Sequence, residues 1–163
     1  MSGMTSLDPA IFRSVLGRFA SGVTVLTTLD GAGRDHGMTV SAFCSVSLEP
    51  PLVLACVDAA AALHPLLREE GRAFGVSILA EEQEALSRRF AGDDDRFSGV
   101  GFTRGPAGTA LLDDAVAHLE CVVHQVHEAG DHAIVVGRVE HVAIRDDAAP
   151  LLYYRSGYGR FAR

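Results

Sequence analysis

The most constraining feature of this sequence is a pair of long, strand-like segments in its last third. Residues 117–128 and 132–144 are rich in β-branched and apolar residues, and Ala129-Gly130-Asp131 lies between them. Gly and Asp are the residues that a tight hairpin turn needs for its backbone. The sequence therefore predicts a long antiparallel β-hairpin within a mainly β fold.

Shorter elements are predicted around this hairpin. Asp8-Pro9 should cap a helix whose apolar residues recur at helical spacing: Ile11, Phe12, Val15, Leu16 and Phe19. Further strands are predicted over 22–29, over a hydroxyl-bearing segment between the turn 30–33 and Pro50-Pro51, and over 52–57, 73–79 and 151–154, with helices over 59–70 and 81–90. Many strands in meander order with few helices favour an antiparallel β-barrel with peripheral helices.

Composition limits the class of protein. The 163 residues are expected to form one domain, residues 1–163, with a substantial core. The net charge of −7 argues against nucleic acid or an anionic membrane as the main partner. The chain contains no lysine, which excludes Schiff-base chemistry. It has no secretion signal and no apolar run long enough to span a membrane, so a cytoplasmic protein is expected.

Four small hydroxyl residues alternate within the segment after the 30–33 turn: Thr39, Ser41, Ser45 and Ser47. In one regular strand they would share a face of the sheet. Buried hydroxyls cost free energy without a partner, so such a face suits a ligand with many acceptors, such as a phosphate and a polyol. The alternative is an edge strand whose hydroxyl face is solvated.

Several standard sites are absent from the sequence. Neither Gly31-Ala32-Gly33 nor Gly99-Val100-Gly101 continues into a dinucleotide-binding fingerprint, and no Walker loop, nucleophile elbow or Cys-x-x-Cys pair occurs. Cys44, Cys56 and Cys121 are expected to be reduced core residues.

A metal site is a further possibility that the pattern raises. His118, Glu120 and His124 fall on one face of a predicted strand. This pattern is more typical of solvated residues on the outer side of a β-ribbon than of metal ligands, so no metal is expected.

Polar residues near the turns are the remaining candidates. His132 follows the hairpin turn and is not required by it, so it is either exposed or directed into a cleft. His64 precedes Pro65 and is either a cap or a surface residue. Tyr158 and Arg160 lie in a tail too rich in glycine for a core, which is either disordered or laid over a ligand.

The order and spacing of several motifs resemble the short-chain flavin reductases, the NAD(P)H:flavin oxidoreductase components of two-component monooxygenases. The matching segments are Phe19–Thr27, Gly37–Leu52, His64–Leu67, Phe74–Leu79, Gln83, Phe90-Ala91, Arg96-Phe97, Leu119–Cys121, Gly130–His132 and Gly137 with Val139. The resemblance covers nearly the whole chain, from about Phe12 to Phe161. It implies an FMN-binding split barrel of antiparallel Greek-key type that forms a homodimer, with flavin near the subunit interface.

The resemblance also implies which residues bind the cofactors. Residues along the flavin ring would be Gly37, Met38, Thr39, Val40 and Ser41. Residues toward the ribityl chain and phosphate would be Ala42, Phe43, Ser45 and Ser47, with Cys56, Val57, Asp58, Ala62, His64, Phe90 and Ala91 around the phosphate or adenylate side. His132, Tyr158 and Arg160 would face the nicotinamide nucleotide, with His132 as a positioning donor, since the hydride chemistry belongs to the cofactors.

The resulting hypothesis is a reductase that passes a hydride from NADH or NADPH to FMN or FAD and supplies reduced flavin to a separate monooxygenase. The alternative is a flavin carrier without NAD(P)H turnover. An oxidase of the pyridoxamine-phosphate type ranks last, because it needs an Arg and Lys cluster for the substrate phosphate. Where many relatives carry phosphate donors, this chain has Asp58-Ala-Ala-Ala-Ala62, which favours an exchanging flavin and leaves FMN and FAD both open.

Overall fold

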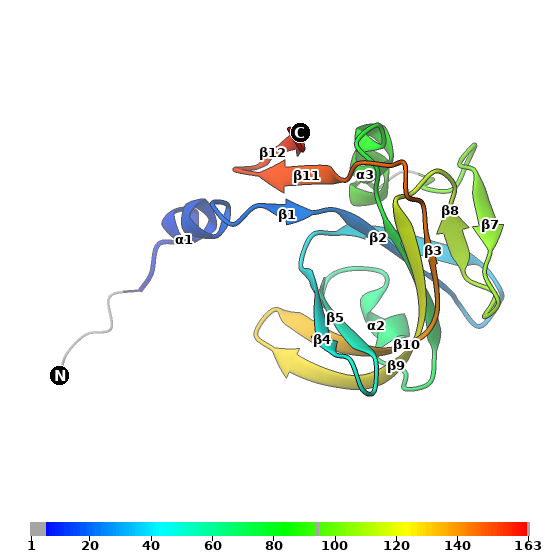
Figure 1. The fold of residues 1–163 in the computed structure, drawn as a ribbon. Helices are drawn as coiled ribbons and strands as arrows, with labels where there is room; N and C mark the ends of the chain where they lie inside the picture. Colours follow the sequence, from blue (N-terminus) through cyan, green and yellow to red (C-terminus); the bar gives the residue numbers. More distant parts are fainter. Residues whose placement is uncertain (1–5, 94, 163) are drawn as a thin grey trace.

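The computed structural model describes residues 6–93 and 95–162, and it is mainly β, with short helices outside the sheets (Figure 1). The elements in chain order are α1 Pro9–Leu16, β1 Ser21–Gly22, β2 Thr24–Leu29, β3 Asp35–Val40, β4 Phe43–Ser47, β5 Leu52–Asp58, α2 His64–Leu67, β6 Ala73–Ile78, α3 Glu84–Ala91, β7 Phe102–Arg104, β8 Ala110–Leu112, β9 Ala117–Ala129, β10 His132–Ile144, β11 Leu151–Tyr154 and β12 Gly157–Arg160. Every strand predicted from the sequence has a counterpart among them.

Seven strands form one antiparallel sheet in the order β3-β2-β6-β9-β10-β5-β4. The edge strands β3 and β4 are joined by Ser41 and Ala42 alone. Because the three steps from Val40 to Phe43 span at most about 11 Å, the sheet has to curl until its two edges approach each other. The predicted β-barrel is thereby confirmed. The single hydroxyl-bearing strand is wrong, since the chain leaves the sheet at Ser41 and the hydroxyls fall on two opposite edges.

The long hairpin of β9 and β10 is confirmed, with pairing from Ala129–His132 to Ala117–Ile144. Its inward residues, Val123 and Val135 among them, join the larger core cluster of the barrel. Gly137 packs so closely on Phe74 that a Cβ atom there would lie 2.5 Å from the ring. Glycine is therefore required at this position for the ring to fill the barrel.

A smaller sheet, in the order β1-β11-β12, carries the C-terminal hairpin. The sequence did not predict β12, which contains Tyr158 and Arg160. Its turn uses Arg155 and Ser156 with φ of 51° and 61°, the backbone of a type I′ turn, which Asn and Gly usually form. Arg and Ser are not residue types that predict such a turn, and strand β12 was therefore missed.

Helices α1 and α2 differ in how well the sequence predicted them. The Asp8 carboxylate accepts the Ala10 N–H at 2.8 Å, which confirms the cap of α1. Helix α2 is much shorter than the predicted 59–70. The Asp58 carboxylate accepts the Ala60 N–H at 2.8 Å and holds the preceding residues in turns.

Helix α3 begins at Glu84, after the predicted start at Glu81. The Gln83 side chain accepts the Ala80 N–H at 2.9 Å and donates to the Asp113 carbonyl at 2.8 Å. These bonds hold the approach to α3 in a turn, so the helix starts only after Gln83.

Two predictions about burial are wrong in part. Cys44 lies exposed on the edge strand β4 and Cys56 is half-buried, while Cys121 is buried and desolvation raises the pKa of its thiol to about 12. Glu120, expected on the solvated face, is buried and accepts the Thr109 hydroxyl at 2.5 Å.

Two absences hold for the part of the chain that the structure describes. Over residues 6–93 and 95–162, no three His, Cys, Asp or Glu side chains are grouped to hold a metal ion. No helix within these same residues has the length and apolar character needed to cross a membrane.

Candidate functional site

Two adjoining cavities lie between β3 and α3. The first, of about 320 Å³, is lined by Met38, Thr39, Asp58, Ala60, Ala61, Ala62, Phe90, Ala91 and Arg96. The second, of about 180 Å³, is lined by Val23, Thr39, Ser41, Ser87, Ala91, Tyr153 and Tyr158. Thr39 and Ala91 belong to both cavities. Residues from β3, α3, β12 and the segment after β5 therefore meet at one place, although they are far apart in the sequence.

Thr39 divides the two cavities, and its orientation is fixed. Its hydroxyl donates to the Ser87 carbonyl at 2.6 Å, so β3 is bonded to α3. This bond leaves the Thr39 oxygen able to accept from a ligand but uses its proton. Ser41, just beyond the end of β3, is exposed at the second cavity. The hydroxyl residues Thr39 and Ser41 thus lie at the site, although not as part of a continuous polar face.

Tyr158 forms one wall of the second cavity. Its hydroxyl hydrogen-bonds the Ser87 hydroxyl at 2.7 Å, and its ring meets Tyr153 in an edge contact with 5.3 Å between centroids. The Arg88 guanidinium lies 4.9 Å from the Tyr158 centroid, within the range of a cation–π contact. The tail is therefore ordered, and its aromatic ring is held over a cavity.

Arg96 brings positive charge to the first cavity. Its guanidinium donates to the Gly92 carbonyl at 2.8 Å and to the Gly37 carbonyl at 2.5 Å. Gly37 is buried, and a Cβ atom on it would lie 2.7 Å from the Phe90 ring. The absence of a side chain at Gly37 lets Phe90 close the floor of the site beside Arg96.

His132 lies at the tip of the long hairpin, at the start of β10. It pairs in register with Asp58, which lines the first cavity, and the Ala59 N–H donates to the Asp131 carbonyl at 2.9 Å. His132 Nδ1 is 2.7 Å from the Asp131 carboxylate, and this hydrogen bond lowers the pKa of that carboxyl. The turn at 129–131 and the segment after β5 are thereby held together.

Comparison with known proteins identifies this arrangement. A family model described as "Flavin reductase like domain" matches residues 16–162. The chain belongs to the flavin reductase-like family. It is 40% identical over 159 residues to a flavin reductase of Pseudomonas putida, a match that covers 97% of this chain and 93% of that one.

Two further matches are equally extensive. The reductase component of 4-hydroxyphenylacetate 3-monooxygenase from Thermus thermophilus is 45% identical over 149 residues, covering 91% of this chain and 94% of that one. The NADH:FAD oxidoreductase of Streptomyces globisporus C-1027, solved with NAD and FAD fragments, superposes with a TM-score of 0.90 at 39% identity, covering 95% and 93%. The predicted family, the split-barrel fold and the flavin reductase class of activity are confirmed.

The residues around the first cavity of this flavin reductase fit a flavin. A volume of about 320 Å³ lies within the usual range of small-molecule sites, about 300–1,000 Å³. Alanines at 60–62 form one side of the cavity, the buried Phe90 ring lies beneath it, and Arg96 supplies a guanidinium. Such a mixture suits a flat ring system that ends in a polar chain.

The structure separates the predicted site residues into two groups. Those that line the cavities are Met38, Thr39, Ser41, Asp58, Ala62, Phe90, Ala91 and Tyr158. Those that do not are Gly37, Val40, Ala42, Phe43, Ser45, Ser47, Cys56, Val57, His64, His132 and Arg160. Gly37 and His132 still contact or pair with lining residues. The side chains of Val40 and Val57 are buried in the core, and Ala42, Ser45 and Arg160 are exposed.

Sequence reasoning missed several residues that line the two cavities. Ser87, Tyr153 and Arg96 line the cavities but were not predicted to do so. Arg96 lay within a segment that carried the resemblance, and that signal could have found it. Ser87 gave no signal of its own, because a serine on a helix is ordinarily exposed.

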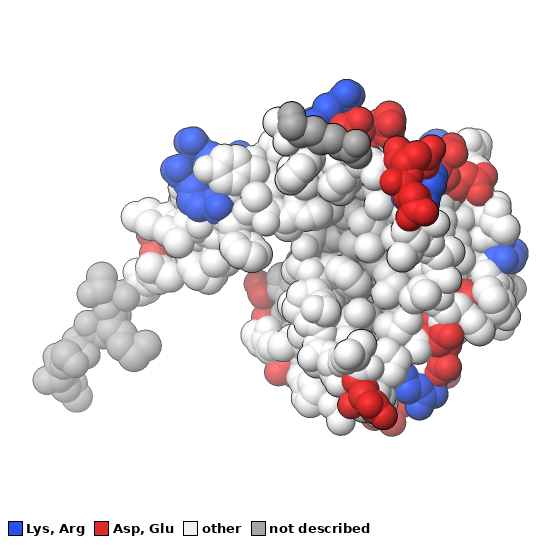
Figure 2. All heavy atoms as spheres, in the orientation of Figure 1, with Lys and Arg blue, Asp and Glu red and all other residues white. Residues whose placement is uncertain are grey.

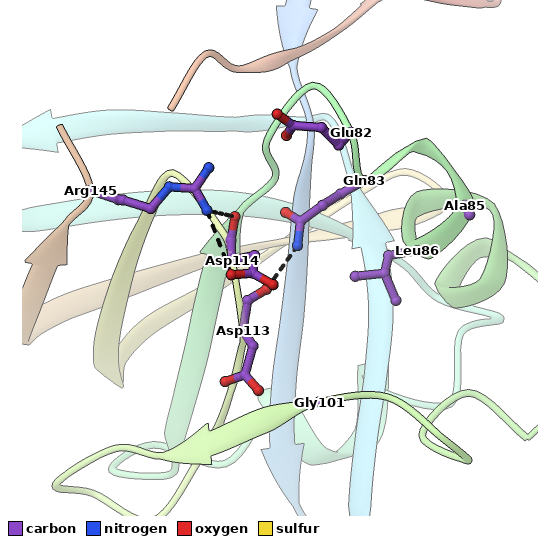
Figure 3. Close-up of a pocket in the computed structure, with 8 residues that line it drawn as sticks. All are labelled: Glu82, Gln83, Ala85, Leu86, Gly101, Asp113, Asp114 and Arg145. Carbon is purple, nitrogen blue, oxygen red and sulfur yellow. Dashed lines mark hydrogen bonds and ion pairs between the residues drawn. The ribbon is translucent and has the colours of Figure 1, made fainter. Parts of the chain in front are cut away.

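A third cavity, of about 550 Å³, lies elsewhere (Figure 3). It contains none of the predicted site residues. Arg145 donates to the Asp114 carbonyl at 2.7 Å, and Gln83 donates to the Asp113 carbonyl, so its main polar groups are engaged within the chain. The Gln83 bond ties the approach to α3, and the Arg145 bond ties the segment after β10, to the residues between β8 and β9, which is a structural role.

Proposed function

We propose that this flavin reductase transfers a hydride from NADH or NADPH to FMN or FAD and releases the reduced flavin to a separate monooxygenase. The observation that carries the proposal is the pair of cavities that meet at Thr39 and Ala91. Hydride transfer needs the two reacting rings about 3–3.5 Å apart. Two adjoining compartments, one for flavin and one for the nicotinamide, meet that need.

Each wall has its own part in binding. A bound flavin supplies the hydride-accepting chemistry, while the chain binds and orients the reactants. Met38, Thr39 and Phe90 border the ring system, and Tyr158 stacks at the nicotinamide side. His132 is included as a positioning donor, because it pairs in register with Asp58, which lines the first cavity.

The proposal includes flavin as an exchanging substrate. The loop 59–62 consists of four alanines. The charged residue just before it, Asp58, is a carboxylate that would repel a phosphate. Arg96 is the guanidinium that faces this cavity. The positive charge of Arg96 is opposed by the negative charge of Asp58, which supports a moderate affinity for the phosphate end of a flavin. A moderate affinity suits a flavin that leaves after reduction.

The relatives support the choice of nucleotide and of partner. One is named an NADH:FAD oxidoreductase, and another a reductase component of a monooxygenase. NADH as the donor and a flavin-dependent monooxygenase as the acceptor of reduced flavin are therefore proposed for this chain. A cytoplasmic location stays a prediction from the sequence.

The proposal also includes a homodimer. Helix α1 extends away from the barrel (Figure 1), and Ile11, Phe12, Val15 and Leu16 on it are all exposed. Figure 2 shows basic side chains over α1 and large uncharged areas on this face of the barrel. Exposed apolar surface of this extent marks an interaction site. A second copy of the chain is the proposed partner, with the flavin near the interface.

The deciding experiment is NADH and NADPH oxidation by the purified protein without flavin, with FMN and with FAD. The proposal expects turnover that appears only when flavin is added and that saturates with flavin. Flavin binding without turnover from either nucleotide would favour the carrier alternative. Turnover without added flavin would show instead that the flavin is tightly retained.

A further inference from the structure

Ser87 is fully buried, and it joins three elements around the second cavity. Its hydroxyl bonds to the Tyr158 hydroxyl at 2.7 Å, and its carbonyl accepts the Thr39 hydroxyl at 2.6 Å. The helix itself does not need a serine here, since alanine has the higher helix propensity. A buried hydroxyl costs free energy unless it is partnered. Its partner is the hydroxyl of Tyr158, an aromatic residue that lines the second cavity.

Tyr158 depends on that bond for its orientation. It lies on β12, the edge strand of the small sheet, which pairs only with β11 among the described strands. The ring also meets Tyr153 on the adjacent strand and the exposed Arg88, and it packs on the apolar cluster that contains Val23, a contact with no direction of its own. Tyr153 moves with the same hairpin, and an exposed guanidinium is a weak restraint. Ser87 is thus the buried anchor of the ring on the helix.

We propose that Ser87 is a positioning residue for the nicotinamide nucleotide, acting through Tyr158. This inference rests on the proposed function of the second cavity. The bond holds the phenol ring as a wall of that cavity before the nucleotide arrives. A wall that is already ordered reduces the conformational entropy lost on binding, so its loss weakens nucleotide binding more than it slows the chemical step.

The test compares Ser87→Ala, Tyr158→Phe and the double variant in steady-state NADH oxidation at saturating flavin. Each single variant should raise the KM for NADH about three- to tenfold, the effect of one hydrogen bond, and leave kcat within about twofold. The double variant should have the KM of Tyr158→Phe, because both changes remove the same contact. Effects that multiply, or an unchanged KM in Ser87→Ala, would overturn the proposal.

A second readout does not depend on activity. The chain has no tryptophan and three tyrosines, and all three, Tyr153, Tyr154 and Tyr158, lie in the C-terminal hairpin. Tyrosine near-UV circular dichroism therefore reports on this hairpin alone. Ser87→Ala should change that signal in the folded protein without nucleotide. An unaltered tyrosine signal would contradict the anchoring role.

A matched control separates positioning from general stability. Thr28 is also buried and donates its hydroxyl to the Ala73 carbonyl at 2.7 Å, on β2 away from the cavities. Thr28→Val should lower stability about as much as Ser87→Ala while leaving the KM and the tyrosine signal unchanged. A wild-type protein that oxidises no NADH would refute the proposed function, and with it the role toward the nucleotide. An active wild type whose KM is insensitive to Ser87→Ala would refute the role of Ser87 alone.

Discussion

Helices α1 and α3 are both eight residues long and both amphipathic, yet they have different environments. Helix α3 packs on the barrel, buries Ser87 and Phe90, and forms a wall of the site. Helix α1 buries no residue, and Ile11 and Val15 are 59% and 61% exposed. An amphipathic pattern therefore indicates that a helix needs an apolar partner surface, and does not reveal whether its own chain provides it.

The largest effect is expected at the buried face of α3. Phe90→Ala should lower the free energy of unfolding by about 3–5 kcal/mol, because the ring is fully buried and meets Phe97 edge-on at 5.1 Å. Urea unfolding followed by far-UV circular dichroism measures this change. In α1, Phe12→Ala should cost the folded monomer less than about 1 kcal/mol.

Protein concentration sharpens this contrast. If α1 is covered by a second copy, the unfolding midpoint of Phe12→Ala will fall as the protein is diluted, while the loss in Phe90→Ala will remain at every concentration. Equal, concentration-independent losses in both variants would show that α1 packs on its own chain.

The next effect concerns the partner of α1. Changing both Ile11 and Val15 to Glu should raise the dimer dissociation constant at least about tenfold, because charge on the apolar face must be desolvated in an interface. Sedimentation equilibrium at micromolar concentration measures it. Arg13→Gln, on the polar side of the same helix, is the control and should leave the dimer intact. A monomeric wild type would reject the homodimer and this reading of α1.

A change at the tip of the β9–β10 hairpin tests whether a residue outside α3 contributes to nucleotide binding. His132→Ala should raise the KM for NADH about three- to tenfold, by removing one positioning hydrogen bond. Flavin binding, followed by fluorescence quenching, should change less than the KM. Nicotinamide kinetics that match the wild type would remove His132 from the site and leave α3 as the dominant wall.

The smallest effects belong to the exposed faces of the two helices. Glu84→Gln on α3 removes the ion pair with Arg88. The charged groups of this pair lie 2.8 Å apart, and the Arg88 and Glu84 side chains are 67% and 48% exposed. Its loss should cost about 0.3–0.5 kcal/mol, as for other i,i+4 pairs. Arg13→Ala on α1 should change stability no more than this. Thermal unfolding of both variants tests whether the helices differ only in their apolar faces.

Much of the fold followed from local pattern. The long hairpin was predicted because its turn residues and its β-branched strands indicate the same structure, and the cap of α1 was predicted from Asp8-Pro9. The strand β12 was missed because its turn places Arg155 and Ser156 at positive φ, which neither residue type signals. The end of strand β3 before Ser41 was missed because the alternation of hydroxyl residues continues past it. The closure of the barrel depends on which strands pair, and this alternation does not encode the pairing.

The tertiary structure decided which of the predicted residues line the two cavities, and their binding of cofactors stays a prediction. Resemblance to a family placed Thr39, Phe90, Ala91 and Tyr158 at the ligands, and these residues do line the two cavities. It also included Val57, whose side chain points into the core because neighbouring residues of a strand face opposite sides.

The sequence by itself determined what is local: most of the strands, the hairpin turn, the start of α1 and the motif order that identifies a flavin reductase. The tertiary structure decided what depends on contacts between distant segments. Ser87, Thr39 and Tyr158 meet across three elements, and Glu120 is buried because Thr109 and its neighbours satisfy the carboxylate. Hydrogen-bond partners far along the chain set those positions, and no periodicity within a single segment encodes them.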